Sequence, residues 1–121
     1  MTVYVSSKLK HKDMWLGRRE EGLPVISSWI DGEKIEGGYA LDMMWERYLT
    51  EISEARYIIV YVEPGDILKG ALIELGAALY KNIPVYVVWD GSIMDLEKQV
   101  GTWIHYRTVT IVQDIGQVDV G

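Results

Sequence analysis

The chain has 121 residues, a length that suits one domain with a single hydrophobic core. It contains no cysteine and two histidines, which excludes disulfides and thiolate sites and leaves little for a histidine-based zinc centre or a Ser-His-Asp triad. The net charge of −6 disfavours a nucleic-acid polymer as partner, and the apolar runs are far shorter than the ~20 residues of a membrane-spanning helix. We therefore predict a cytoplasmic protein with no membrane partner.

Strand-like and helix-like patterns alternate along the chain. In chain order, the first third predicts a strand at 2–6, a polar helix at 11–22, a strand at 23–30 and a glycine-rich loop at 31–38. An amphipathic helix at 39–53 follows, then an apolar strand at 57–62, a turn at 63–66 and a helix that ends near Asn82. The remainder predicts a strand at 84–89, a short helix at 92–100 and a last strand at 108–112.

This alternation predicts an α/β domain over residues 1–121, with right-handed crossovers between parallel strands. The segments 57–62 and 84–89 are apolar on both faces, as strands are when helices cover both sides of a parallel sheet. We expect a flavodoxin-like, Rossmann-type three-layer sandwich whose five-stranded parallel sheet has the order 2-1-3-4-5.

Open parallel sheets bind ligands beyond the carboxyl ends of their strands. Ser6 and Ser7 follow the first predicted strand, where hydroxyls and free N–H groups suit a phosphate or a ribose. Trp29 and Asp31 end the second, where they can stack on a base and hydrogen-bond it. The sequence leaves the alternatives open: ordinary turn chemistry for the serines, and a core tryptophan beside a capping aspartate for the second pair.

Glu74 stands alone among glycine and aliphatic residues in the segment 70–79. A mostly buried helix tolerates a carboxylate only if something pairs with it, protonates it or uses it. Its helical neighbours are small, which leaves room for another body. Two interpretations stay open: a face that packs on another helix, with Glu74 as a satisfied rim charge, or a carboxylate beside a ligand. Asp66 is placed to cap the start of this helix.

Three other sets of residues are candidates for the site, the core or the surface. Lysines gather after the first strand, with Lys8 and Lys10, and Lys69 precedes Gly70; they are interpreted either as phosphate contacts or as solvated side chains. Trp15 and Trp45 recur at helical spacing, which favours packing in the core or an interface. His11 and His105 have no partner by spacing, so we expect them at the surface.

The segment 55–88, ARYIIVYVEPGDILKGALIELGAALYKNIPVYVV, resembles the core of the nucleoside 2-deoxyribosyltransferase superfamily, which includes deoxynucleoside monophosphate N-glycosidases. The shared features are a strand that ends in an acidic residue, a glycine-containing turn, a helix with E-[LI]-G, and an N-x-P-V turn into the next strand. The chain is also similar to short proteins of phage and bacterial genomes.

The resemblance implies that Glu74 is a nucleophile that attacks the anomeric carbon, so that water or a second base resolves a covalent glycosyl-enzyme intermediate. It implies that Glu63 orients the sugar or protonates the departing base, and that Gly65 and Gly70 border the substrate. No metal or organic cofactor is required. Tyr48 stands where the family has an aspartate, and Asp42 and Glu46 are nearby candidates to replace it, although neither is at the matching position.

We therefore predict an enzyme that cleaves or transfers the N-glycosidic bond of a (deoxy)nucleoside or nucleotide. Lys8 and Lys69 favour the nucleotide. The family's habit of building sites at subunit boundaries, together with the aromatic helix at 39–53, predicts a homodimer or a higher homo-oligomer. Two alternatives stay open: a non-catalytic protein that binds or sequesters nucleotides, and a glutamate-dependent glycohydrolase of NAD-like dinucleotides.

Overall fold

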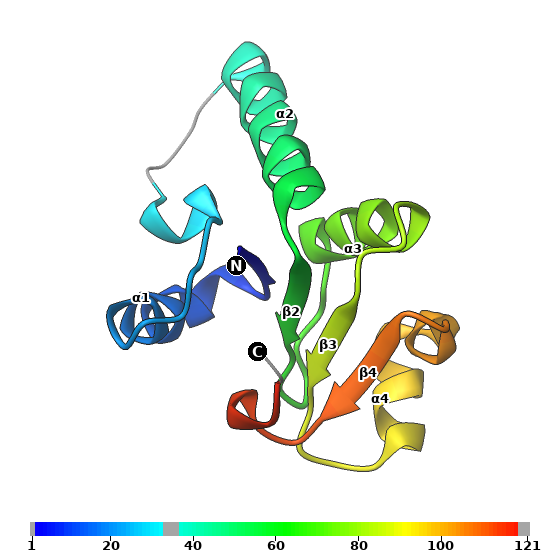
Figure 1. The fold of residues 1–121 in the computed structure, drawn as a ribbon. Coiled ribbons are helices and arrows are strands. Elements are labelled where there is room, and N and C mark those ends of the chain that lie inside the picture. Colours follow the sequence, from blue (N-terminus) through cyan, green and yellow to red (C-terminus); the bar gives the residue numbers. More distant parts are fainter. Residues whose placement is uncertain (1, 33–36, 119–121) are drawn as a thin grey trace.

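The computed structural model describes residues 2–32 and 37–118, apart from the side chain of Tyr39. Within these residues, four parallel strands form one sheet in the order β1-β2-β3-β4. The strands are β1 (Val3–Ser6), β2 (Tyr57–Tyr61), β3 (Val85–Val88) and β4 (Val109–Val112). The helices α1 (Lys12–Glu20), α2 (Gly38–Glu54), α3 (Gly70–Tyr80) and α4 (Ile93–Val100) flank the sheet (Figure 1). The predicted α/β class with a parallel sheet is confirmed.

The predicted strand at 23–30 is wrong. Val25 forms only an isolated parallel bridge with Val3, whose N–H donates to Pro24 O at 3.0 Å and whose carbonyl accepts from Ile26 N–H at 2.9 Å. Beyond this bridge, side chains take the backbone groups of Val5, since its N–H donates to Ser27 Oγ at 2.7 Å and its carbonyl accepts from Trp29 Nε1 at 2.7 Å. The chain then turns into a short 3₁₀ helix at Ser28–Asp31. The described sheet therefore has four strands, and the predicted order 2-1-3-4-5 gives way to β1-β2-β3-β4 with this segment along the outer edge of β1.

The core lies on both faces of the sheet. The strand residues Val3, Val5, Ile59 and Val85 are fully buried, which is why these strands read as continuous apolar runs. Trp15 of α1 is also fully buried, as predicted. Helices α2 and α3 pack against each other and form one wall of the candidate site described below.

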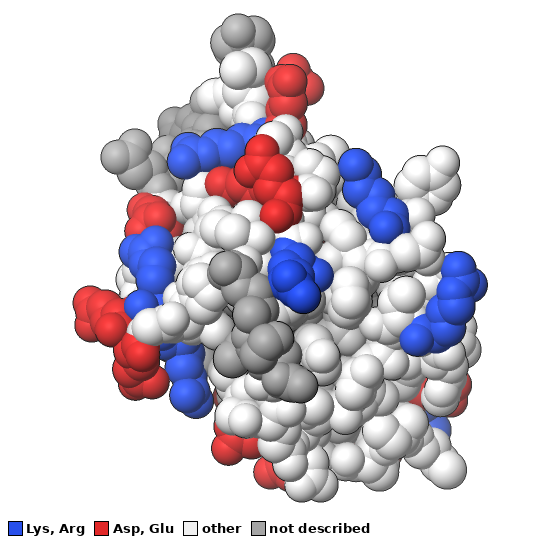
Figure 2. All heavy atoms as spheres, viewed as in Figure 1, with Lys and Arg blue, Asp and Glu red and all other residues white. Residues whose placement is uncertain are grey.

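On the face seen in Figure 2, charged side chains of both signs gather over α1 and α2, whereas the surface over α3 and β4 is largely uncharged apart from isolated Lys and Arg. None of the described helices is both long enough and apolar enough to span a membrane. Of the predicted loop at 31–38, residues 33–36 lie outside the described residues.

Candidate active site

Glu74 lies in the second turn of α3 and is 7% exposed. Its Oε2 accepts a hydrogen bond from the hydroxyl of Tyr4, and its Oε1 accepts one from the hydroxyl of Ser6 at 3.1 Å. Tyr4 and Ser6 are two positions apart on β1, so their side chains leave the same face of the sheet and meet α3. The lone carboxylate is therefore buried and bound by two hydroxyls.

The surroundings of Glu74 change its protonation. Burial raises the pKa of Glu74 to about 7, with a smaller contribution from the negative charge of Glu51, although the hydroxyls of Tyr4 and Ser6 act in the opposite direction. Burial and the neighbouring Glu74 carboxylate also raise the pKa of Tyr4 far above its ordinary value. At neutral pH, Tyr4 is therefore protonated and donates a hydrogen bond, whereas the Glu74 carboxyl group is present in both its protonated and its ionised form.

A cavity of about 290 Å³ opens beside Glu74. Aromatic rings form one wall: Trp29, Trp45 and Tyr48. Trp29 Nε1 donates to the carbonyl of Val5 at 2.7 Å, which fixes this ring; the residue is 9% exposed, so most of it belongs to the core and only a part faces the cavity. The remaining lining comes from the segments that follow β1 and precede α3: Ser7, Lys8, Leu9, Ile67, Leu68, Lys69, Gly70 and Ala71.

Gly70 allows α2 and α3 to approach closely at this wall. A Cβ at position 70 would lie 3.2 Å from Cη2 of Trp45, closer than an ordinary van der Waals contact. Trp45 is half-buried and lines the cavity, in contact with Tyr48 through an edge-to-face arrangement with ring centroids 5.7 Å apart. Trp45 therefore lies at the site and outside the core, and its predicted place in an interface stays a prediction.

The structure brings together most residues predicted at the strand ends. The Ser6 hydroxyl donates to the Glu74 carboxylate. Those that line the cavity are Ser7, Lys8, Trp29, Lys69, Gly70 and Glu74. The Ser7 hydroxyl already has two hydrogen-bond partners within the protein: it donates to the carbonyl of Lys8 at 3.0 Å and accepts from Trp15 Nε1 at 2.9 Å.

Three predicted residues lie elsewhere. Asp31 forms a bidentate ion pair with Arg19, at 2.7 and 3.0 Å, because the 3₁₀ turn directs Trp29 inward and Asp31 outward toward α1. Asp42 is exposed on α2 and does not line the cavity. Gly65 occupies the exposed turn after β2 with φ +87°, a conformation that favours glycine, and also lies outside the cavity.

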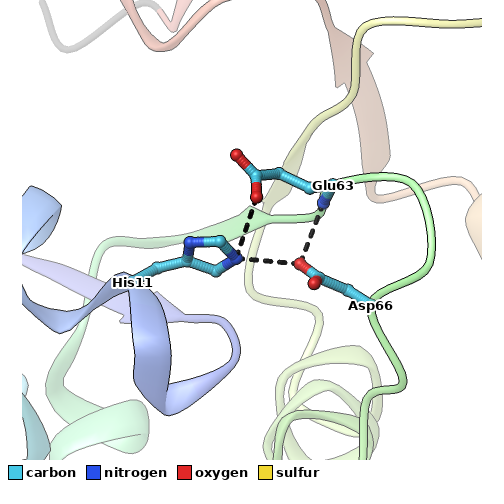
Figure 3. Close-up of side chains that lie close together, drawn as sticks. All are labelled: His11, Glu63 and Asp66. Carbon is cyan, nitrogen blue, oxygen red and sulfur yellow. Dashed lines mark hydrogen bonds and ion pairs between the residues drawn. The ribbon is translucent and has the colours of Figure 1, made fainter.

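Glu63 and Asp66 belong to a second group, the His11 cluster (His11, Glu63 and Asp66; Figure 3). His11 Nε2 lies 2.9 Å from Asp66 Oδ2 and 3.7 Å from Glu63 Oε1. The His11 side chain is 10% exposed, so its predicted surface position is wrong. His105 is exposed as expected, in contact with Glu97 at 2.9 Å.

Asp66 does not cap α3. That helix begins four residues later, after Lys69, and no side chain caps it. Asp66 Oδ2 instead accepts the N–H of Glu63 at 3.0 Å, which closes the turn 63–66, and Oδ1 pairs with Lys10 Nζ at 2.9 Å. Burial raises the pKa of Asp66, but the bonds from Lys10, the Glu63 N–H and His11 outweigh it and lower this pKa to about 2.

Sequence reasoning missed Tyr4 and Glu51. Tyr4 shares a strand face with Ser6, a signal that was present but indistinguishable from an ordinary apolar strand. Glu51 Oε1 accepts both the N–H and the hydroxyl of Ser28 at 3.0 Å, which ties the turn that carries Trp29 to α2. Its partner lies 23 positions away, so no local pattern reveals it.

Two solved structures are similar to this one. A 2-deoxyribosyltransferase from Bacillus psychrosaccharolyticus superposes with a TM-score of 0.63 at 16% identity, covering 94% of this chain and 87% of that one. A CMP N-glycosidase from Clostridium botulinum has a TM-score of 0.56 at 16% identity, covering 93% and 88%. The chain shares their fold. No family model matches the sequence, and no curated protein matches it significantly.

Within this shared fold, the segment 55–88 forms β2, the turn 63–66, α3 and β3. The E-L-G motif that begins at Glu74 therefore lies in the helix between the two central strands, with the glutamate turned toward β1.

Proposed function

We propose that the protein cleaves or transfers the N-glycosidic bond of a (deoxy)nucleoside or nucleotide, with Glu74 as the nucleophile. One observation carries this proposal: a carboxyl group with a pKa of about 7 lies at the wall of a cavity, bound by two hydroxyls and faced by aromatic rings. The names of the two structural neighbours, a 2-deoxyribosyltransferase and a CMP N-glycosidase, support it.

In the first step, an oxygen of ionised Glu74 forms a bond to the anomeric carbon while the bond from that carbon to the base breaks. The bonding electrons leave with the base, which takes up a proton from solvent. In the second step, water or another base attacks the same carbon, gives up a proton to solvent and releases the carboxylate. The hydroxyls of Tyr4 and Ser6 stabilise the carboxylate as it forms again, because both already point at its oxygens.

Glu63 has no role in this proposal, although the sequence predicted one. Its carboxylate is turned toward Tyr61, whose hydroxyl donates to Oε2 at 2.7 Å, and toward His11. It does not line the cavity beside Glu74.

The cavity favours a nucleoside 5′-monophosphate as the substrate. Trp29, Trp45 and Tyr48 offer ring surfaces for a base, and Lys8 and Lys69 offer positive charge for one phosphate. Its volume of about 290 Å³ lies just below the roughly 300–1,000 Å³ of ligand pockets, which suits a mononucleotide better than an NAD-like dinucleotide.

The test is a panel of nucleosides, their 5′-monophosphates and NAD, with released base measured by chromatography. We expect base release by the natural chain, a higher kcat/KM for a 5′-monophosphate than for its nucleoside, and no release by Glu74→Gln. Asp42→Asn is the matched control, because it neutralises a carboxylate on α2 outside the cavity and should retain activity. Tight nucleotide binding without base release would contradict the proposal and support the sequestering alternative.

A further inference from the structure

We propose that the His11 cluster binds a divalent transition-metal ion, with His11 Nε2, Asp66 Oδ2 and Glu63 Oε1 as the protein ligands. This site is separate from the proposed active site, since none of the three residues lines the cavity beside Glu74. One imidazole nitrogen with two carboxylate oxygens is a donor set that suits zinc and the ions that replace it, such as cobalt.

The geometry is close to that of a coordinated ion. The three donor atoms lie within 4.8 Å of one another, and two of the separations are 2.9 and 3.7 Å. Metal–ligand bonds of about 2.0–2.2 Å place neighbouring donor atoms roughly 3 to 4 Å apart, so an ion fits between them after small side-chain movements. Because the Glu63 side chain is 46% exposed, solvent reaches the site and water can complete the coordination.

The outer oxygens of both carboxylates are already held by neighbours, as is usual around metal ligands. The Tyr61 hydroxyl donates to Glu63 Oε2 at 2.7 Å, and Lys10 Nζ pairs with Asp66 Oδ1 at 2.9 Å. The inner oxygens are thereby turned toward His11 Nε2 (Figure 3). Gln99 Nε2 fixes the turn beneath them, since it donates to the carbonyls of Glu63 and Asp66 at 2.9 and 3.0 Å.

The charge of the cluster also favours a divalent cation. Two carboxylates face one lysine ammonium, and the Asp66 side chain is wholly buried, so the carboxylate charges outnumber the lysine charge at the cluster. The competing explanation is an ion-pair network that only ties the 3₁₀ turn Leu9–His11 to the turn 63–66. The two explanations make different predictions: only a metal site binds a divalent cation saturably and loses that binding when a ligand side chain is replaced.

The test is direct titration of the tag-free, chelator-treated full chain with Zn²⁺ by calorimetry, and with Co²⁺ by visible absorption. We expect one ion per chain and ligand-field bands for Co²⁺. His11→Gln and Glu63→Gln should each weaken binding at least ~10-fold, as the loss of a metal-site group does. Zinc should also raise the melting temperature of the natural chain.

The control is His105→Gln. His105 Nε2 lies 2.9 Å from Glu97 Oε1, the same separation as in the His11 pair, but within the described part of the chain no third ligand group joins them. This variant should bind zinc like the natural chain. The proposal is overturned if no saturable binding occurs, or if His105→Gln weakens it as much as His11→Gln. Melting curves without metal verify that each variant folds. If His11→Gln does not fold, Glu63→Gln replaces it in the comparison with His105→Gln, because Glu63 is half-exposed.

Discussion

At the scale of single residues, the protonation of Glu74 controls the proposed reaction. A nucleophilic carboxylate must be ionised, and burial raises the pKa of Glu74 to about 7. We therefore expect kcat/KM for base release to rise as the pH is raised through about 7 and to level off above it. Tyr4→Phe removes a donor that favours the ionised form, so it should move this midpoint to higher pH. A profile that is flat from about pH 5.5 to 8.5 would contradict the role of Glu74.

The same pKa predicts how Glu74 affects stability. The folded-state pKa lies above the ordinary 4.5, so protonation favours the folded state. This contribution is fully present below about pH 4.5 and is lost as the pH rises through about 7. Relative to the natural chain, Glu74→Gln should therefore gain about 1–3 kcal/mol in free energy of unfolding between pH 5 and pH 8. Denaturant unfolding at both pH values measures it, and Asp42→Asn should show no such difference.

At the scale of elements, the contact between α2 and the first turn of α3 shapes the cavity. Gly70→Ala places a Cβ 3.2 Å from the Trp45 ring, which must move by a few tenths of an ångström. We expect nucleotide binding to weaken several-fold, because the moved ring changes the wall of the cavity. Stability should change little, because the preference of alanine for a helix, up to about 1 kcal/mol over glycine, offsets the cost of the crowded contact.

Gly76→Ala is the matched control for this prediction. It lies on the same helix, and a Cβ there would meet nothing within 4 Å. This variant should gain stability without any change in nucleotide affinity. Calorimetry with a nucleoside 5′-monophosphate measures the affinity of both variants. Equal affinities would show that the contact between position 70 and Trp45 does not determine the shape of the cavity.

At the scale of the whole molecule, the homodimer predicted from the sequence stays a prediction, but its physical basis changes. Trp45 and Tyr48, the anchors expected from the sequence, are half-buried at the cavity. The outer side of α3 instead exposes Ile73 and Tyr80, at 61% and 88%. The surface over α3 is also largely uncharged (Figure 2), so we expect two copies to associate there.

Light scattering of the natural chain at micromolar concentration tests this expectation. Ile73→Glu, which places a charge on the exposed face, should dissociate the dimer, whereas Asp42→Asn should not. A natural chain that scatters as a 13.8 kDa monomer would contradict the prediction.

The sequence determined those properties that depend on local pattern. Apolar runs located β1, β2, β3 and β4, and periodicity located the helices, because burial on both faces of a sheet or one face of a helix leaves a short-range signature. Glu74 was recognisable for the same reason, as one carboxylate in an apolar helix. The prediction of a strand at 23–30 was wrong because an apolar run cannot show that the side chains of Ser27 and Trp29 take the backbone groups of Val5, which leaves a single bridge.

Tertiary structure alone decided which side chains meet. Tyr4 binds Glu74 across 70 positions, and His11 meets Asp66 across 55. Glu63 follows β2 as predicted, yet its carboxylate joins His11 and stays away from the Glu74 cavity. Such pairings depend on strand register and on the direction in which each turn leaves the sheet. Strand register and turn direction are fixed only when the whole core packs, so they cannot be predicted from the spacing of residues along the chain.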